Sequence, residues 1–273
     1  MENKRGVSTG QAFGIALFLT IMTLVTVYIF VAKIWWFPNP ISAFAESIDA
    51  QFHRTLWICG VIFFLAQMAL AFVVFRYRGN APNAGHSHGN TKLEVIWTAA
   101  TAILFVGLGL FGERAWASLH FTGAAPGAIQ VEVTGQQFAW NFRYAGPDGK
   151  FGRTDPKLIS DSSGNPLGLD PADPASADDV VAATLAVPVN HEVELTLRSK
   201  DVTHSFFVRE LRLKQDAVPG LKIKIHFDAD KEGQYEIVCA ELCGLGHHRM
   251  RSFLQVKPQA EYEAWLKEQA PSQ

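Results

Sequence analysis

Three long apolar stretches in the first half of the chain constrain its fold more than any other feature. They cover residues 11–36, interrupted only by Lys33 near the end, residues 56–75, with no charge, and residues 93–111, with Glu94 near the start. A helix needs roughly 20 mostly apolar residues to cross the hydrocarbon core of a bilayer. The sequence therefore predicts three membrane-spanning helices, followed by a C-terminal part that reads as a soluble domain.

The first apolar stretch has a second interpretation, a cleavable signal peptide. It follows Lys4 and Arg5, and the small residues Ala43 and Ala45 flank Phe44 in a pattern resembling a cleavage site. Its apolar core is longer than the roughly 7–15 residues usual for a signal peptide. That length favours a retained helix, and cleavage stays the alternative.

The distribution of positive charge predicts the orientation of these helices. Residues 38–51 contain no Lys or Arg, whereas basic residues precede the first stretch and separate the second from the third. Because loops rich in Lys and Arg stay in the cytoplasm, both basic groups belong inside. We therefore predict a multi-pass protein of a bacterial-type inner (plasma) membrane, with its C-terminal domain on the extracytoplasmic, periplasmic side. The basic residues are Lys4, Arg5, Arg76, Arg78 and Lys92.

The C-terminal half has the pattern of an all-β domain. Apolar and polar residues alternate over residues 128–134, 191–199 and 221–227, with shorter apolar runs between them. Many short strands at close spacing are typical of a β-sandwich or barrel. Residues 145–179 interrupt the pattern and are rich in Asp, Pro, Gly and Ser, which predicts a solvated surface insertion. Residues 259–273 predict a short closing helix and a tail.

Most of the chemistry-bearing residues gather in one run, VCAELCGLGHHRM, at residues 238–250. Thiolate and thioether ligands favour Cu(I), and imidazole suits copper in general. A single blue-copper ion takes one thiolate, two imidazoles and a weak axial ligand, whereas this run has two thiolates four positions apart. It therefore fits a two-copper site better than a one-copper site. The run contains Cys239, Glu241, Cys243, His247 and Met250, and His204 in DVTHSFF is the candidate for a further ligand.

Plainer interpretations of the same residues remain open from the sequence. Cys239 and Cys243 could form a disulfide in an oxidising compartment. The two cysteines, His247 and His204 could hold a structural zinc ion, although zinc has little need of the Met250 thioether. His248 adjoins His247, and sequence chemistry does not separate the two as ligands.

Composition excludes other classes. The net charge is −2, with no basic stripe, which argues against a nucleic-acid partner. The chain has 3 cysteines, too few for a disulfide scaffold.

The pattern C-x-E-x-C-G-x-x-H-x-x-M, with an upstream D-V-x-H-S, resembles cytochrome c oxidase subunit II, which carries the two-copper centre called CuA. The resemblance covers residues 52–258 and implies a transmembrane helical hairpin followed by an all-β, cupredoxin-like Greek-key sandwich. It divides the chain into an extra span with an outer loop (1–51), the hairpin (52–117), the extracytoplasmic domain (118–258) and the closing segment (259–273).

The resemblance also implies a role for each residue of the motif. Cys239 and Cys243 would contact both coppers. His204 and Met250 would complete one copper, and His247 with the Glu241 backbone carbonyl would complete the other. The Glu241 carboxylate would bind magnesium shared with subunit I.

The same resemblance implies roles for residues outside the motif. Glu94 would lie at the entrance of a proton pathway into subunit I, although alone it reads as a charged helix end. Asp201 would belong to the cytochrome c docking surface. Phe138 falls where the family has a tryptophan that receives electrons, and Trp140 matches a second family aromatic. Arg143 falls where some relatives carry an acid, which would change the charge of the docking face.

The expected function is that of an enzyme subunit that transfers electrons and does not itself make or break substrate bonds. It would take electrons from cytochrome c, or a similar donor, and pass them to heme in subunit I, where oxygen reduction drives proton pumping. The expected partners are subunit I, other oxidase subunits, the electron donor and membrane lipid. Three alternatives are a membrane-anchored protein that binds or delivers copper, a quinol oxidase subunit II, which lacks copper ligands, and a nitrous oxide reductase, which needs a further domain.

Overall fold

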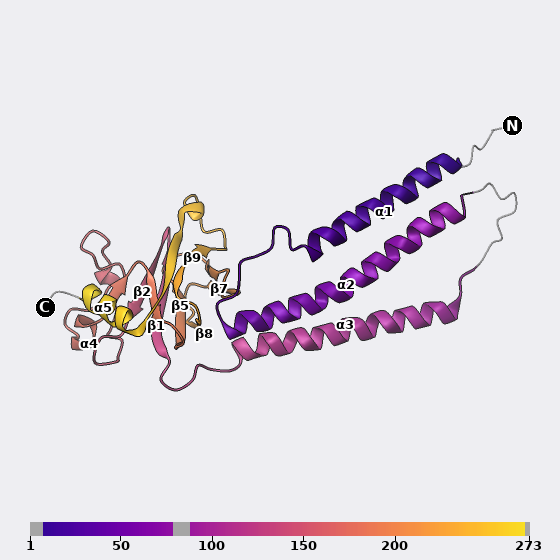
Figure 1. Ribbon diagram of the computed structural model, residues 1–273. Helices are drawn as coiled ribbons and strands as arrows, with labels where there is room; N and C mark the ends of the chain where they lie inside the picture. The colour runs from indigo at the N-terminus through magenta and orange to yellow at the C-terminus, as the bar shows by residue number, and fades with distance from the viewer. Residues whose placement is uncertain (1–7, 79–87, 271–273) are drawn as a thin grey trace. The chain divides into compact units, whose positions relative to one another are not determined.

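The computed structural model describes residues 8–78 and 88–270 (Figure 1). Three helices in these ranges are long and apolar enough to cross a membrane, which confirms the predicted spans: α1 (Thr9–Val31), α2 (Ala43–Arg76) and α3 (Thr91–His120). Of the charges used to predict orientation, Lys4 and Arg5 lie outside the described residues.

Side-chain hydrogen bonds cap the N-terminal ends of these helices. Ser8 Oγ accepts the Gln11 backbone N–H at 3.2 Å and starts α1. Ser42 Oγ accepts the Ala45 N–H at 3.0 Å, so α2 begins well before the apolar stretch at residues 56–75. Asn90 Oδ1 accepts the Lys92 N–H at 3.1 Å at the start of α3. Such caps satisfy backbone donors that a helix leaves free in its first turn.

The C-terminal half forms two five-stranded sheets, in the orders β3-β2-β1-β5-β8 and β4-β10-β9-β6-β7. This confirms the predicted fold class, because a two-sheet β domain follows three long apolar helices. Each sheet contains one parallel pair, β1 with β5 and β4 with β10. The strands are β1 (Ile129–Gln136), β2 (Ala139–Tyr144), β3 (Val180–Ala182), β4 (Leu185–Pro188), β5 (Glu192–Ser199), β6 (His204–Val208), β7 (Leu213–Ala217), β8 (Ile223–Asp228), β9 (Gly233–Cys239) and β10 (Arg251–Lys257).

The core of this domain follows the alternation in the sequence. Val193, Leu195 and Leu197 on β5 are fully buried, with intermediate residues between them. Side chains from both sheets join in one apolar cluster. The predicted closing helix is α5 (Gln259–Gln269), whose Tyr262 is buried. A rigid sandwich of this kind can hold a loop between two strands in one conformation.

The insertion at residues 145–179 has more internal order than a solvated loop requires. It contains a short 3₁₀ helix, η1 (Pro156–Leu158), a single helical turn, α4 (Pro174–Ala177), and a bridge between Thr154 and Leu169. Arg143 on β2 fastens it: its side chain is 2% exposed, donates to the Gly152 carbonyl at 2.6 Å and pairs with buried Asp179. The guanidinium also pairs with Glu132 at 3.0 Å.

Residues 38–49, here called the strap, form one compact unit with residues 114–273. The strap belongs to the segment predicted as an outer loop, and it packs directly on the β domain. Ile41 is 2% exposed in the β-domain core and donates its N–H to the Glu210 carbonyl at 3.2 Å. The Asp49 carboxylate accepts two hydrogen bonds from Arg212, both of 2.8 Å.

The strap also contains the motif that resembles a cleavage site. Ala45 is fully buried in the first turn of α2. Cleavage after Ala45 would remove Ile41 from the core of the β domain.

Candidate metal centre

One loop between β9 and β10 contributes most of the predicted ligands, and its base is closed by backbone hydrogen bonds. The Cys239 N–H donates to the Met250 carbonyl at 3.1 Å. The Ala240 N–H donates to the Ser205 carbonyl at 2.9 Å, which ties the loop to β6. A short 3₁₀ helix, η2 (His247–Arg249), forms its far side. The loop is thus held at both ends by the sheet.

His204 reaches this loop from the first position of β6. The antiparallel register pairs Phe206 with Cys239, so the strand places His204 beside the start of the loop. The ring is fully buried. It packs against the backbone of β1, because a Cβ at Gly135 would lie only 2.9 Å from His204 Cδ2. Glycine at position 135 therefore makes room for the imidazole.

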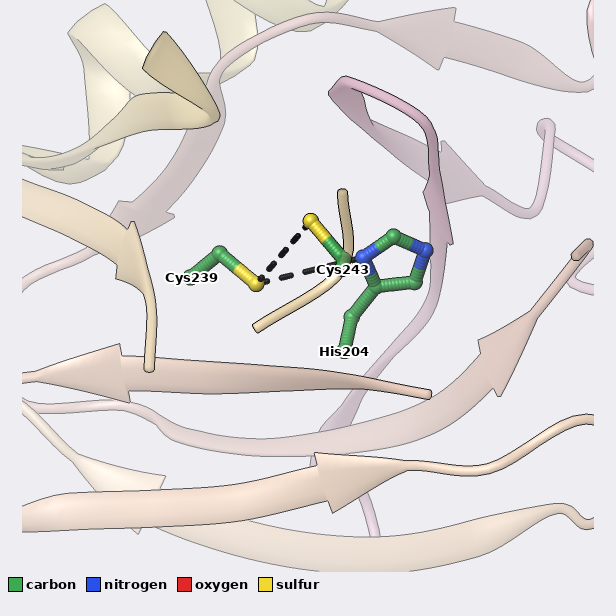
Figure 2. Close-up of side chains that lie close together, drawn as sticks. All are labelled: His204, Cys239 and Cys243. Atoms are coloured by element: carbon green, nitrogen blue, oxygen red, sulfur yellow. Dashed lines mark hydrogen bonds between the residues drawn. The ribbon is translucent and has the colours of Figure 1, made fainter. Parts of the chain in front are cut away.

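The atoms that could bind metal, here called the donor set, come from His204, Cys239, Glu241, Cys243, His247 and Met250. Cys239 lies at the centre of one half of this set. Its Sγ is 3.9 Å from Cys243 Sγ and 3.9 Å from His204 Nδ1, and Figure 2 shows these three side chains converging. The same Sγ donates to the Glu241 backbone carbonyl at 3.2 Å. The ligand atoms of the three side chains all lie within 4.8 Å of one another, as a metal site requires.

Cys243 holds the other half of the set. Its Sγ is 3.6 Å from His247 Nδ1 and 3.7 Å from Met250 Sδ. Cys243 and Met250 are 3% and 1% exposed, so their sulfur atoms face the protein interior. The structure thus brings together all six residues that the sequence proposes as ligands.

The structure also bears on the alternatives left open by the sequence. The two cysteines are free, and their sulfur separation of 3.9 Å is far from the roughly 2.05 Å of a disulfide. His248 is exposed, and its Nε2 accepts a hydrogen bond from Arg249 at 3.2 Å. The ring that lies beside a cysteine sulfur is that of His247.

Burial controls the ionisation of the Cys243 thiol. Burial, and next the neighbouring Cys239, raise the pKa of Cys243 to about 11. Without metal the Cys243 thiol is therefore protonated at neutral pH. A metal ion binds the thiolate, so binding must release this proton.

Two groups behind the ligands complete the site. Asp201 Oδ1 accepts a hydrogen bond from His204 Nε2 at 2.8 Å. Burial raises the pKa of Asp201, but hydrogen bonds from the Gln137 N–H, His204 and the Val202 N–H outweigh it and hold the pKa below its usual value. The sequence missed Gln137, whose Nε2 donates to the Cys243 carbonyl at 2.6 Å. An exposed glutamine carries no chemical signal by itself, so no pattern would have found it.

The two aromatic residues suggested for electron acceptance lie beside the donor set in different ways. Phe138 is 37% exposed, and its ring lies against the loop backbone, where a Cβ at Gly246 would collide with it. Trp140 is buried, with its ring centroid 6.0 Å from that of His204 in an edge-on arrangement. The Phe138 ring is therefore partly exposed to solvent, and the Trp140 ring lies beside the proposed ligand His204.

Other residues singled out by the sequence lie outside the donor set. The Glu241 side chain is exposed, although its carbonyl faces Cys239. Glu94 is exposed in the first turn of α3, where a negative charge interacts favourably with the positive end of the helix dipole. Arg143 is buried and paired with acids, so it does not add positive charge to a docking face.

Comparisons with known proteins agree with this architecture. The family model described as cytochrome C oxidase subunit II, periplasmic domain, matches residues 129–256, and the model of its transmembrane domain matches residues 32–113. An alternative cytochrome c oxidase subunit 2 from Bradyrhizobium diazoefficiens is 34% identical over 93% of this chain and 91% of its own length. The cytochrome c oxidase subunit 2 of Thermostichus vulcanus is 32% identical, over 85% of this chain and 77% of its own length.

A solved structure is also similar. The crystal structure of the periplasmic domain of cytochrome oxidase subunit II from Bradyrhizobium japonicum is 27% identical and covers 53% of this chain and 95% of that domain, with a TM-score of 0.39. The two family models make this a membrane protein with a periplasmic domain. The chain belongs to the cytochrome c oxidase subunit II family, and it is a subunit of a heme-copper oxidase complex.

Proposed function

We propose that this chain is the subunit of a cytochrome c oxidase that receives electrons from cytochrome c through a dicopper CuA centre and passes them to heme in subunit I. The observation that carries the proposal is the donor set around Cys239 and Cys243. Two sulfur atoms 3.9 Å apart have an imidazole, a thioether and a carbonyl within 3.9 Å of one or the other, and a second imidazole lies at 3.6 Å. Soft sulfur and imidazole donors are the ligands copper prefers.

The family motif implies which donors would complete each ion. Cys239 and Cys243 would contact both ions. His204 and Met250 would complete one ion, and His247 and the Glu241 carbonyl would complete the other. When bound, the two coppers would supply a one-electron relay. The chain's own contribution is a donor set fixed between β9, β10 and β6, which limits ligand motion during electron transfer.

The alternatives fit this donor set less well. A tetrahedral zinc site needs four ligands, which leaves the Met250 thioether and the Glu241 carbonyl without a purpose. A copper-delivery protein must release its metal, and the buried, sheet-anchored sulfur atoms of Cys243 and Met250 oppose release. A quinol oxidase subunit II has no use for such ligands.

Two aromatic rings would connect the donor to the centre. Phe138 lies at the surface against the loop, and Trp140 meets the His204 ring. We assign electron acceptance from cytochrome c, or a similar carrier, to this surface. The oxygen chemistry and the heme groups belong to subunit I.

Metal analysis of the purified oxidase tests the proposal. We expect two copper ions in this subunit after subtraction of copper in the other subunits, and no zinc. A single copper, or zinc in its place, would reject the dicopper assignment.

Two further roles belong to the contact with subunit I. The exposed Glu241 carboxylate would bind magnesium shared with that subunit. Glu94 would stand at the entrance of its proton pathway, as the family resemblance implies, and its place at the end of a membrane span fits a proton route.

We expect Glu94→Ala in the whole oxidase to slow proton uptake and turnover, while reduction of the copper centre by cytochrome c keeps its normal rate. The physical reason is that the variant removes a proton-accepting group in α3 and leaves the β domain unchanged. Stopped-flow spectroscopy with a pH indicator measures both steps in one experiment. Unchanged turnover would leave Glu94 with only its helix-end role.

A further inference from the structure

The proposed copper ligands come from two separate segments, which the backbone hydrogen bond between Ala240 and Ser205 joins and which side-chain hydrogen bonds connect further. His204 begins β6, whereas the other five ligands lie on residues 239–250. The turn between β1 and β2 approaches the second of these segments, because a Cβ at Gly244 would lie 2.8 Å from Gln137 Nε2. The turn and the connection between β5 and β6 contribute no ligand.

One unbroken path of hydrogen bonds connects these segments. His204 Nε2 donates to Asp201 Oδ1 at 2.8 Å. The Gln137 backbone N–H donates to Asp201 Oδ2 at 2.7 Å. The Gln137 side-chain Nε2 then donates to the Cys243 carbonyl at 2.6 Å. The path begins at one ligand and ends at the backbone of another, and both Asp201 oxygens are used within it.

We propose that Asp201 and Gln137 are positioning residues that set the imidazole and the cysteine loop for copper before the metal binds. This inference rests on the proposed function. Asp201 is therefore an internal support of the site, and its carboxylate is not simply a docking charge as the family resemblance implies.

Proton placement on His204 explains the contribution of Asp201. A carboxylate only accepts hydrogen bonds, so His204 Nε2 must carry the ring proton of the neutral imidazole. Its Nδ1 then has a free lone pair, and this is the atom that lies 3.9 Å from Cys239 Sγ. Carboxylates that accept from a ligand imidazole fix its tautomer and orientation in the same way at other metal sites.

Backbone placement explains the contribution of Gln137. Its amide holds the Cys243 carbonyl, and the backbone of Cys243 determines where Sγ lies. Because Asp201 holds the Gln137 backbone in turn, the imidazole and this sulfur are positioned by the same carboxylate. Removing either residue should loosen the His204 ring or the Cys243 backbone, while the strand pairing of β6 with β9 stays in place.

Copper binding to the full-length chain in detergent tests the proposal, with Asp201→Asn, Gln137→Ala and Gln136→Ala compared by competition with a copper chelator. Loss of a partner behind a metal ligand typically weakens metal affinity by about 10- to 100-fold, and we expect that range for Asp201→Asn and Gln137→Ala. Gln136 is the matched control, because it adjoins Gln137 but its Oε1 accepts from Lys200 at 2.8 Å. We expect its affinity to stay within about twofold of wild type.

A second measurement separates positioning from general stability. Nitrogen NMR of the copper-free chain, labelled with ¹⁵N only in histidine, reports which ring nitrogen carries the proton. We expect Nε2–H for His204 in the wild type. In Asp201→Asn the Gln137 N–H should hold the amide oxygen and turn the NH2 group toward the ring, so we expect the ring proton on Nδ1. The thermal unfolding midpoint should stay close to wild type in Gln137→Ala, whose side chain lies at the surface.

Each outcome of these experiments decides something. If the wild type binds two coppers and both Asp201→Asn and Gln137→Ala match Gln136→Ala in affinity, the positioning roles are wrong and the proposed function stands. Should Asp201→Asn not fold, the affinity of Gln137→Ala alone decides. If the wild-type chain does not bind two coppers, the proposed function itself fails.

Discussion

Replacing Cys243 by serine should abolish the two-copper centre. Cys243 Sγ lies within 3.9 Å of Cys239 Sγ, His247 Nδ1 and Met250 Sδ, so three other proposed ligands meet at this atom. A serine hydroxyl is a harder ligand than a thiolate, and copper binds it poorly. We expect at most one copper per subunit in Cys243→Ser, and loss of electron transfer from cytochrome c.

Cys59→Ser is the matched control for this variant. Cys59 is the one cysteine of the chain that is not a proposed ligand, and it is exposed on α2. Both variants exchange a thiol for a hydroxyl, but only one touches the donor set. Copper analysis of the two purified oxidases should therefore differ by at least one ion per subunit. Two coppers in Cys243→Ser would contradict the assignment of this sulfur as a ligand of both ions.

Replacing Arg143 by alanine should produce a large loss of stability in the β domain without touching the metal site. The Arg143 side chain is 2% exposed and pairs with Asp179, which is fully buried, and with Glu132. Removing one partner of a buried ion pair leaves the other charge unpaired, which costs about 3–5 kcal/mol. Burial already raises the pKa of Asp179 despite the Arg143 hydrogen bond, so desolvation of this carboxylate is substantial.

Arg153→Ala gives the comparison for an exposed ion pair in the same insertion. The Arg153 side chain is 72% exposed and pairs with Asp170 at 3.0 Å, and such pairs contribute up to about 1 kcal/mol. Urea unfolding in detergent, followed by near-ultraviolet circular dichroism, measures both variants. Equal shifts for Arg143→Ala and Arg153→Ala would show that the insertion does not depend on its buried charge pair.

Elements with strong local signals were predictable from the sequence. The three spans follow from apolar length alone, and β5 follows from its alternation. The start of α2 was not predictable from hydropathy, since it depends on the Ser42 cap and on strap residues that pack against a domain far along the chain. The parallel pairing of β1 with β5 likewise depends on long-range packing, which no local pattern specifies.

In the candidate site, too, some residues could be identified from the sequence and others could not. Its cysteines, His247 and Met250 lie on one short loop, so their spacing carries a chemical signal. His204 is 35 residues from Cys239, and it was identified by its residue type and its place at the start of a predicted strand. Gln137 and Asp201 act through hydrogen bonds between three segments, and their residue types are common on any surface. Only the folded arrangement reveals that path.

The two buried sulfur atoms of Cys239 and Cys243 should hold a pair of coppers that act as one redox centre. Electron paramagnetic resonance of the oxidised, purified oxidase tests it most directly. We predict a hyperfine pattern from one unpaired electron shared equally by two copper nuclei, and its loss in Cys243→Ser. A pattern from a single copper nucleus, or no copper signal from a fully loaded subunit, would contradict the account.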